Sequence, residues 1–534
     1  MKSSEETKRT NLSGFKIKTC YNAEDISQID VDNDIGKPGE YPFTRGIYNT
    51  MYRGRPWTIR QLGSLGSPSK ANDRIRQLIE MGATGISICF DMPTIMGRDS
   101  DDPLSEGEVG SCGGVAIDSL DDMHRLFNKI ELDKTSVNLV SNSQSSVMLA
   151  FLVAVAEDQN IPIEKLTGTM QNDILKEYQA QKSFYFPPEP SMRLTIDTLC
   201  FCNEHIPRFN PISISGCHLG QAGATPVQEL AFMLANGFTY VEEGIKAGLS
   251  VDSFAPRLSF FFEVNNDFFE NIVKYRAARR IWAKTMREKY KAKDPRSWTF
   301  RVHTQTSGFS LTAQQPENNI IRVTIQGLSA VLGGTQSLHT NGFEEAHSIP
   351  TPRSEKLALR TQQIIAHESG VTNTVDPLAG SYYVEALTDQ MESECKKYFE
   401  EIEHFGGVLP AIEKGYFQKI IADSAFKYQK EIEEKKRIIV GLNAFVEEEE
   451  EDNIEIRECD PEFEKKKITD LIELKKKRDP ALVKVHLDKI RNIINGSDNV
   501  MPVLIEAVKD YVTLGEIIGV MRDVFGEYKE DSVY

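Results

Sequence analysis

The sequence of 534 residues lacks most of the features that mark metal-binding, disulfide-rich or membrane proteins. None of its eight cysteines forms a CxxC pair, and its nine histidines show neither HxxxH nor HExxH spacing, so neither a zinc site nor a disulfide framework is expected. No apolar run is long enough to span a bilayer, and the amino-terminal MKSSEETKRTNLSG lacks the apolar core of a secretion signal. We expect a cytoplasmic protein with reduced thiols, no membrane span and no metal ion held by this chain alone.

Positive charge is also scarce, because 62 Lys and Arg residues face 79 Asp and Glu residues. The net charge of −17 argues against general nucleic-acid binding. The segment YPFTRGIYNTMYRGRPWTIR, residues 41–60, is an exception, since it sets five aromatic residues among four arginines. Arginine offers a planar charged fork that matches phosphate, and aromatic faces can cover a flat ring. The segment suits a long polyanionic ligand with an adenine ring, such as coenzyme A, although a basic surface loop anchored by aromatic residues would have the same composition.

Strand-like and helix-like stretches alternate from about residue 70 onward. Helices are predicted at 71–82, 119–130, 146–159, 226–248 and 267–292. Short strands are predicted at 84–94, 136–142, 165–174, 211–220, 255–267 and 300–308. The alternation indicates an α/β protein with a parallel sheet, and the number of strands approaches eight. We therefore predict a (β/α)8 TIM barrel, with an open doubly wound sheet as the alternative.

Several predicted strands carry small polar residues two positions apart, where a filled barrel carries Val, Ile and Leu. The pairs are Ser87 and Cys89, Thr167 and Thr169, Ser213 and Ser215, and His303 and Gln305. Each pair falls on one face of its strand because side chains alternate along a strand. If that face points inward, the barrel has a polar, partly hollow interior that a slender ligand can thread. The alternative is a filled core in which these side chains hydrogen-bond one another.

Nine short motifs follow one another along the chain: YPFTRG, MYRGRPWTIRQ, FDMPT, TGTMQNDILKEY, PPEPSMR, ISISGCH, FAPRLSFF, HTQTSG and GGTQSLHTN. Together they resemble the methylmalonyl-CoA mutase family, from about residue 41 to the carboxyl terminus. The chain looks like the large, substrate-binding part of an adenosylcobalamin-dependent acyl-CoA mutase. The resemblance implies a barrel threaded by the pantetheine of CoA and capped by the corrinoid, in which a radical reaction rearranges the acyl carbon skeleton. A closed barrel suits this chemistry because it keeps water and stray thiols away from the radical.

The resemblance also implies roles for individual residues. His218 and Gln171 match catalytic positions, and His218 would hydrogen-bond the thioester carbonyl, whereas outside its motif it would be interpreted as a core histidine. The positions that match substrate contacts are Tyr48, Met51, Arg55, Thr58, Arg60, Leu62, Ser87, Cys89, Thr169, Gln181, Arg257 and Ser259. Arg55 among them matches a phosphate ligand. The positions that match contacts to the corrin or the adenosyl group are Phe90, Cys112, Gln221, Gln305, Gly308, Asn341 and Glu345. Glu345 would accept hydrogen bonds from the ribose hydroxyls.

Three positions depart from the family patterns. Methylmalonyl enzymes carry an arginine for the free carboxylate of their substrate where this chain has Gln181, and a tyrosine where it has Leu62. A buried carboxylate without a cationic partner is costly, so the pocket is expected to take an uncharged acyl group. The chain also resembles 2-hydroxyisobutyryl-CoA mutase large subunits, which place an aspartate for the substrate hydroxyl where this chain has Cys89. A hydrocarbon acyl group such as isobutyryl, pivalyl or isovaleryl therefore fits better than 2-hydroxyisobutyryl.

The cobalamin-binding motif of the family, DxHxxG, is absent from the sequence, and His367 in AHESG lacks the aspartate and the context. We therefore expect a separate small subunit that brings the cobalamin domain, in a heterotetramer that is a dimer of heterodimers. The expected domains are an amino-terminal arm and the start of the CoA-binding segment at 1–55, the acyl-CoA-binding barrel at 56–400 and a helical and linker region at 401–534. The acidic run at 447–456 is expected to be solvated and without chemistry.

Two other interpretations remain open at this point. The first is methylmalonyl-CoA mutase proper, in which another cation, for example Arg98, replaces the missing arginine. The second is a catalytically silent subunit that pairs with an active one. The presence of five matching residues argues against a silent subunit: His218, Gln171, Arg55, Arg257 and Glu345.

Overall fold

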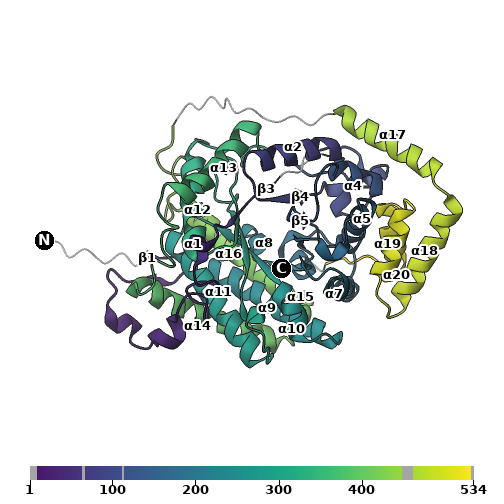
Figure 1. Ribbon diagram of the computed structural model, residues 1–534. Helices are drawn as coiled ribbons and strands as arrows, with labels where there is room; N and C mark the ends of the chain where they lie inside the picture. Colours follow the sequence, from purple (N-terminus) through teal and green to yellow (C-terminus); the bar gives the residue numbers. More distant parts are fainter. Residues whose placement is uncertain (1–8, 63–65, 111–112, 448–460, 531–534) are drawn as a thin grey trace.

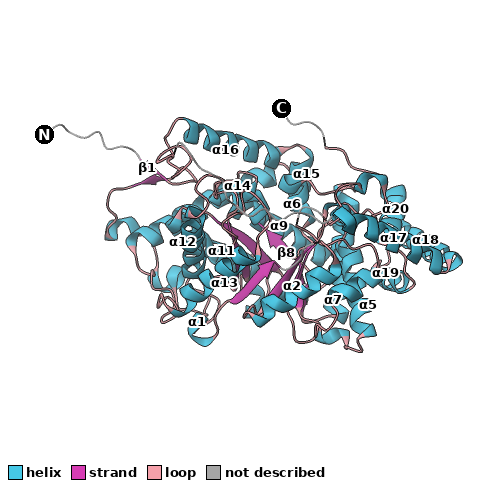
Figure 2. Ribbon diagram, turned by 90° about the horizontal axis from the view of Figure 1, so that it is seen from above, coloured by secondary structure: helices cyan, strands magenta, loops and turns pink. Residues whose placement is uncertain are grey.

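The structure is a computed structural model that describes residues 9–62, 66–110, 113–447 and 461–530. Its centre is a ring of parallel strands surrounded by helices (Figures 1 and 2). In sheet order the strands are β7 (Phe209–Asn210), β6 (Gly168–Met170), β5 (Val137–Val140), β4 (Gly85–Cys89), β3 (Thr58–Leu62), β11 (Ser337–His339), β10 (Val302–Thr306), β9 (Ser259–Val264) and β8 (Ser213–Ser215).

Residues 209–215 close this ring. β7 pairs with β6 and β8 pairs with β9, although only two residues separate β7 from β8. The backbone N–H of Ser213 also donates to the carbonyl of Gln171, just beyond β6, at 2.9 Å. The two short strands β7 and β8 therefore share one strand position, and the nine strands make a barrel of eight positions. The predicted (β/α)8 barrel is confirmed, and the alternative of an open sheet is wrong, because an open sheet would leave two unpaired edges.

Helices surround the barrel and extend it on one side. The helices between and after the strands are α2 (Pro68–Glu80), α4 (Leu120–Leu126), α5 (Ser145–Asp158), α7 (Pro188–His205), α9 (Pro226–Lys246), α11 (Phe268–Glu288), α12 (Asn318–Gly333) and α13 (Pro352–His367). Short helices in the connections are α1 (Met51–Gly54), α3 (Met92–Ile95), α6 (Ile174–Lys176), α8 (Cys217–Gln221) and α10 (Val251–Phe254). The later helices are α14 (Tyr382–His404), α15 (Val408–Glu413), α16 (Tyr416–Glu433), α17 (Pro461–Lys477), α18 (Pro480–Asn495), α19 (Met501–Lys509) and α20 (Leu514–Phe525). A small hairpin of β1 (Arg9–Thr10) and β2 (Lys16–Ile17) precedes the barrel.

Two predicted strands are shorter in the structure than in the sequence pattern. The stretch 211–220 is a strand only over β8, because α8 begins at Cys217 and carries His218. The stretch 255–267 is a strand only over β9, because residues 255–257 form a 3-10 turn before it. The first shortening places His218 at the carboxyl ends of the strands, where parallel barrels build their sites. The second places Arg257 at the opposite end of the barrel, where the strands begin.

Helix α5 is buried on nearly all sides, unlike an ordinary outer helix of a barrel. The reason is that α19 packs against it from outside, and the carboxyl-terminal helices α17–α20 stand beside this side of the barrel (Figure 1). Leu149, Phe151 and Val153 accordingly belong to one hydrophobic cluster with Leu504 and Val508 of α19. A continuously apolar helix in the sequence thus signals a second layer of helices.

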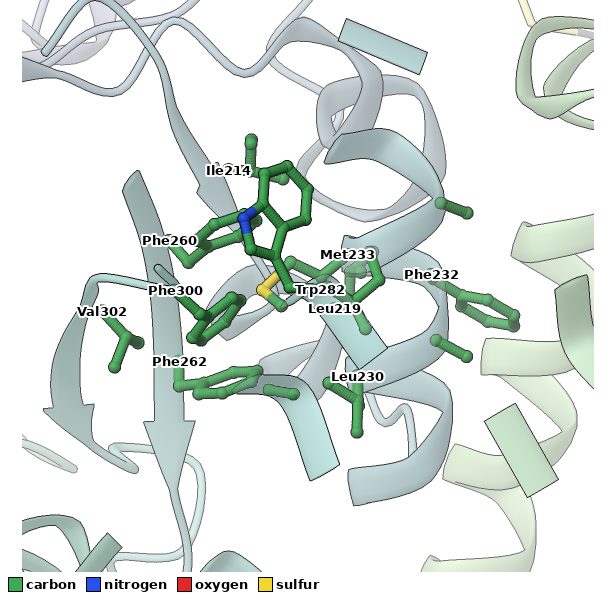
Figure 3. Packing of buried hydrophobic residues seen from close by; sticks show 14 of the residues in the cluster. Ile214, Leu219, Leu230, Phe232, Met233, Phe260, Phe262, Trp282, Phe300 and Val302 are labelled. Carbon is green, nitrogen blue, oxygen red and sulfur yellow. The ribbon is translucent and has the colours of Figure 1, made fainter. Parts of the chain in front are cut away.

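Strand β9 shows how the barrel divides apolar and polar side chains. Phe260 and Phe262 point outward, where Phe260 lies 4.8 Å from Trp282 of α11 and 4.0 Å from Phe300 between ring centroids (Figure 3). Ser259 and Phe261, which alternate with them, face the interior. The hydrophobic core therefore lies between the sheet and its helices, and the axis of the barrel is left to polar groups.

Polar side chains inside the barrel hydrogen-bond their neighbours around the ring. Asn138 Nδ2 donates to Ser87 Oγ at 3.0 Å, Asn210 Nδ2 donates to Thr169 Oγ1 at 3.3 Å, and His303 Nδ1 lies 2.6 Å from Ser337 Oγ. These bonds run from strand to strand and leave the axis open, with a cavity of about 440 Å³. The predicted polar interior is confirmed, and a completely filled core is wrong.

None of the described helices combines the length and the apolar composition that crossing a bilayer requires. The expected domain limits at residues 55 and 400 stay predictions. Residues 448–456 of the acidic run lie outside the described residues.

Candidate active site in the barrel

The axial cavity brings together many of the residues predicted as site residues. Those that line it are Thr58, Arg60, Leu62, Ser87, Cys89, Phe90, Thr169, Gln171, Gln181, His218, Gln221, Ser259 and Gln305. They come from six strands or from the segments that follow them, so only closure of the barrel assembles them. The cavity lining does not include Tyr48, Met51, Arg55, Arg257, Gly308, Asn341 and Glu345. Cys112 lies outside the described residues.

Arginines gather at the end of the cavity where the strands begin. Arg301 precedes β10 and lines the cavity, Arg257 precedes β9, and Arg208 precedes β7. Burial, followed by like charge from its arginine neighbours, lowers the pKa of Arg257. Within the described chain none of these three arginines has a carboxylate partner. This mouth therefore presents free guanidinium groups, which is the chemistry that phosphates require.

Arg60 has a different position from the arginines of the mouth. It is buried in the wall of the cavity, donates to the carbonyl of Ile86 at 3.1 Å and to Ser136 Oγ at 2.9 Å, and burial lowers its pKa to about 10. Arg55 and Tyr48 are exposed on the surface near the start of the barrel. Arg301 was missed by the motif comparison, although strand alternation places it on the same face as His303 and Gln305.

His218 lies at the opposite end, in α8, directly after β8. Its Nδ1 is 2.7 Å from Ser215 Oγ, and its ring lies edge-on to Phe261 with centroids 5.9 Å apart. Burial, with a smaller contribution from the charge of Lys176, holds the pKa of His218 well below its usual range. The imidazole is therefore neutral. When Nδ1 accepts from the Ser215 hydroxyl, Nε2 carries the proton and can donate to a carbonyl oxygen in the cavity.

Gln171 follows β6 and is fixed beside the same end. Its Oε1 accepts a hydrogen bond from Asn142 Nδ2 at 2.8 Å, and Asn142 Oδ1 accepts from the backbone N–H of Asp173 at 3.2 Å. The amide of Gln171 is thereby oriented with its N–H groups toward the cavity. Gln171 and His218 can thus present hydrogen-bond donors from two different strand ends.

Gln181 lies at the same end, and a lysine stands behind it. Lys176 is completely buried, donates to Glu177 Oε1 at 2.6 Å and also hydrogen-bonds Gln181 Oε1. The other carboxylate oxygen of Glu177 accepts from the backbone N–H of Ser183 at 2.9 Å. Gln181 lines the cavity and Lys176 does not. The cation at this end is therefore enclosed and neutralised by its own carboxylate, and Gln181 offers its amide N–H groups to the cavity.

Arg98 does not supply a replacement cation. Its guanidinium pairs with Asp102 Oδ2 at 2.8 Å, and it is not among the described residues that line the cavity. Leu62 and Cys89 line the cavity instead, and burial raises the pKa of the Cys89 thiol to about 12, so the thiol stays neutral. The geometry thus gives a barrel with free positive charge at one mouth and an uncharged pocket at the other.

Comparison with known proteins fits this arrangement. The family model described as methylmalonyl-CoA mutase matches residues 10–527.

The chain belongs to the methylmalonyl-CoA mutase family.

Its relatives include the 2-hydroxyisobutanoyl-CoA mutase large subunit of Aquincola tertiaricarbonis, which is 47% identical over 98% of this chain and 93% of the relative. The methylmalonyl-CoA mutase of Escherichia coli K12 is 43% identical over 96% of this chain and 72% of the relative. The mitochondrial methylmalonyl-CoA mutase of Homo sapiens is 41% identical over 97% of this chain and 69% of the relative. All three relatives are named as mutases of CoA esters, and mutases are isomerases.

The mutase-family positions predicted to face the cofactor lie where β10 and β11 end. Gln305 Nε2 donates to Asn341 Oδ1 at 3.4 Å, while Asn341 Nδ2 is buried and has no hydrogen-bond partner in the described chain. A side chain at Gly308 would come within 3.2 Å of Asn341 Nδ2 and within 3.4 Å of Glu345 Cγ. Desolvation and the charge of Glu344 raise the pKa of Glu345 to about 7. An unsatisfied amide, a carboxyl group and a gap kept open by glycine fit the base and the ribose hydroxyls of an adenosyl group.

No group of His, Cys, Asp and Glu side chains in the described part of the chain is arranged to hold a metal ion. The family positions in this chain are suited to the organic part of the cofactor.

Proposed function

We propose that this chain is the acyl-CoA-binding large subunit of an adenosylcobalamin-dependent mutase. Its substrate would carry a short, branched and uncharged acyl group. The observation that carries the proposal is the closed ion pair at the acyl end. The ammonium of Lys176 is shared between Glu177 and Gln181 Oε1, and Gln181 alone reaches the cavity.

An acyl group with a free carboxylate would meet an unfavourable environment at this end. The neighbouring positive charge already has a carboxylate partner. Gln181 is exposed in this chain alone, so the cost of a second carboxylate, several kcal/mol when no cation balances it, applies once the cofactor and the small subunit cover this end of the cavity. Leu62 and the neutral thiol of Cys89 add uncharged surface. Isobutyryl, pivalyl, isovaleryl and 2-hydroxyisobutyryl groups satisfy this condition, and methylmalonyl does not.

The two ends of the cavity have distinct tasks in this proposal. Arg301 and Arg257 bind the phosphates of CoA at the mouth through charge-assisted hydrogen bonds, with Arg55 on the surface nearby. At the other end, the donors of His218 and Gln171 hold the thioester carbonyl. A neutral imidazole stabilises charge on that oxygen without giving up its proton, which suits a rearrangement that needs no net proton transfer.

The cofactor would be held above the acyl end by Gln305, Gly308, Asn341 and Glu345, with Phe90 and Gln221 on the cavity wall. When bound, adenosylcobalamin supplies the radical that starts the rearrangement. The chain's own residues fix the acyl group and exclude water. A separate small subunit would bring the cobalamin domain, and the words "large subunit" in the name of the Aquincola relative support this arrangement.

The test is an acyl-CoA panel assayed with adenosylcobalamin and a cobalamin-binding small subunit. We expect turnover of acyl-CoAs whose acyl group is branched and uncharged. Methylmalonyl-CoA should turn over at no more than about 1% of that rate, because burying its free carboxylate costs several kcal/mol. Gln181→Arg should reduce turnover of uncharged substrates and improve binding of methylmalonyl-CoA. Gln181→Met is the control, because it changes the size of the side chain little and adds no charge, and it should not improve binding of methylmalonyl-CoA.

Methylmalonyl-CoA mutase proper is the second candidate, because its relatives are 41–43% identical and a lysine lies directly behind Gln181. Turnover of methylmalonyl-CoA at a rate similar to that of uncharged substrates, abolished in Lys176→Met, would favour it and contradict our proposal. Binding of CoA esters without turnover of any of them would instead indicate a catalytically silent subunit.

A further inference from the structure

The two donors at the acyl end, Gln171 and His218, follow different strands but are connected to one buried carboxylate. This is Asp173, two residues after Gln171 in the turn that follows β6. Asp173 is completely buried and is not among the described residues that line the axial cavity. It therefore cannot touch a ligand in the cavity, and the proposed function gives it no task.

Both carboxylate oxygens of Asp173 accept hydrogen bonds. Its Oδ2 accepts from the backbone N–H of Ser215, at the end of β8, at 2.7 Å, and its Oδ1 accepts from the hydroxyl of Tyr240 of α9 at 2.6 Å. The Tyr240 hydroxyl also accepts from the backbone N–H of Leu175 at 3.0 Å. Burial raises the pKa of Asp173 only to about 6, so the carboxylate is ionised at neutral pH. A charged acceptor thus ties the turn after β6 to the end of β8.

Ser215 carries this connection to His218. Its side chain is fully buried, and among the described residues the hydroxyl has one hydrogen-bond partner, His218 Nδ1 at 2.7 Å. If Nδ1 held the proton and donated it to Ser215 Oγ, the hydroxyl hydrogen would be buried without an acceptor, which is unfavourable. The Ser215 hydroxyl therefore donates to Nδ1, and the ring proton is on Nε2.

The Nε2 atom of His218 is the one directed at the axial cavity. His218 lines this cavity, and Nε2 has no hydrogen-bond partner in the part of the chain that the structure describes. Phe261, which also lines the cavity, lies edge-on to the imidazole and limits its rotation. The contact at Nδ1 thus decides which proton the ring offers to a ligand.

The main chain of Asp173 holds the second donor. Its N–H donates to Asn142 Oδ1 at 3.2 Å, and Asn142 Nδ2 donates to Gln171 Oε1 at 2.8 Å. Between them, Asn172 adopts a left-handed backbone with φ of 46°, a conformation that asparagine tolerates better than most residues. This turn lets Gln171 line the cavity while Asp173 reaches Tyr240 of α9.

We propose that Asp173 is a positioning residue for both donors of the acyl end. Its carboxylate fixes Ser215, the Ser215 hydroxyl holds His218 with the proton on Nε2, and its backbone N–H fixes Asn142 and through it Gln171. The use of the two donors on a thioester rests on the proposed function, whereas the hydrogen bonds belong to the chain itself. Because one buried group sets both donors, a displacement of Asp173 disturbs the site without any lost contact to substrate.

The position of the His218 proton is the decisive measurement, because it needs neither substrate nor cofactor. We would label the histidines of the full chain with 15N and assign His218 by the signals that are lost in His218→Asn. NMR should show an unprotonated Nδ1 and a protonated Nε2 in the wild type. In Ser215→Ala the two ring signals should move toward each other, as they do when the proton is shared between the nitrogens. A proton on Nδ1 in the wild type, or unchanged signals in Ser215→Ala, would overturn the inference.

Variants of Asp173 test the next link. Asp173→Ala should shift the His218 ring signals in the same direction as Ser215→Ala does. In the turnover assay it should lower kcat by up to about 10²-fold, with little change in KM, because the donor is misplaced and no substrate contact is removed. Asp173→Asn should recover most of both effects, since its amide oxygen can still accept from the Ser215 N–H. A residue with only a structural role would lower the melting temperature and leave the ring signals in place.

Tyr275→Phe is the matched control, because it also removes one buried hydroxyl, which lies 2.6 Å from Thr304 Oγ1 and apart from Asp173. It should keep both the ring signals and kcat. If Asp173→Ala does not fold, Tyr240→Phe replaces it and should give a smaller shift in the same direction. Unchanged ring signals in whichever of these two variants folds would overturn the inference. Absence of turnover by the wild type would count against the proposed function alone, and the ring signals would still decide the role of Asp173.

Discussion

The two ends of the axial cavity differ in whether their positively charged side chains are paired with carboxylates. At the mouth where the strands begin, Arg301 and Arg257 have no carboxylate partner in the described chain. At the acyl end, Lys176 is fully buried and held by Glu177. The two ends are built by the same strands, so the difference arises from the turns at the strand ends and not from the barrel itself.

This difference explains how one tunnel can bind a ligand that is highly charged at one end and neutral at the other. An unpaired guanidinium in contact with water keeps its charge available for a phosphate. An ammonium that is paired inside the protein contributes a fixed dipole and little net charge. In the proposed function, this arrangement would favour entry of an acyl-CoA with its acyl group first.

The largest effect is expected from breaking the ion pair at the acyl end. Lys176→Met should lower the free energy of unfolding by about 3–5 kcal/mol, because Glu177 is left buried without a cation. Lys176→Met combined with Glu177→Gln should recover most of this loss, since both charges are then removed. Denaturant unfolding of the two variants measures the difference, and equal losses in both would show that the charge pairing is not the cause.

The next effect concerns the chemistry at the acyl end. His218→Asn should lower kcat by roughly 10²–10³-fold, that is about 2.7–4 kcal/mol, with little change in KM, because the donor to the thioester oxygen is misplaced. Wild-type kcat should show no loss from histidine protonation between pH 8 and pH 6, because burial and Lys176 hold the pKa of His218 well below its usual value. A kcat that titrates near 6.5 and loses this titration in His218→Asn would contradict the neutral imidazole.

The smallest effect is expected at the charged mouth. Arg301→Gln should raise KM for the acyl-CoA by about 10–100-fold, corresponding to a charge-assisted hydrogen bond of about 1.5–3 kcal/mol, and should leave kcat nearly unchanged. The difference should shrink at high salt, because Arg301 is only partly buried. Arg360→Gln, on the outer surface of α13, is the control; a similar KM change there would mean that general surface charge, not the mouth, attracts the ligand.

Much of the fold could be predicted from local patterns. The alternation of strands with helices predicted the barrel, and the polar pairs such as His303 and Gln305 predicted its polar interior. The closing stretch 209–215 could not be predicted in this way, because β7 and β8 find their partners in β6 and β9 across the chain. The second layer of helices outside α5 was missed for the same reason: its contacts join residues far apart in the sequence.

The candidate site shows the same division. The motifs named the residues at both ends of the cavity, and most of those motif positions do line it. Arg301 lay outside the motifs, although its strand position could have predicted it.

The sequence by itself determined the family, the barrel and the absence of an arginine at position 181. It could not determine where the charge of Lys176 goes. In a regular α-helix, residues five apart point about 140° away from each other, so Lys176 and Gln181 would not meet. The chain instead forms a π-helical turn at Glu177–Gln181, with the N–H of Lys182 bonded to the carbonyl of Glu177 at 2.8 Å, and this wider turn brings the ammonium onto the glutamine. Only the tertiary structure buries Lys176 and Glu177 together, and it thereby decides that this ammonium is paired with a carboxylate and does not line the cavity.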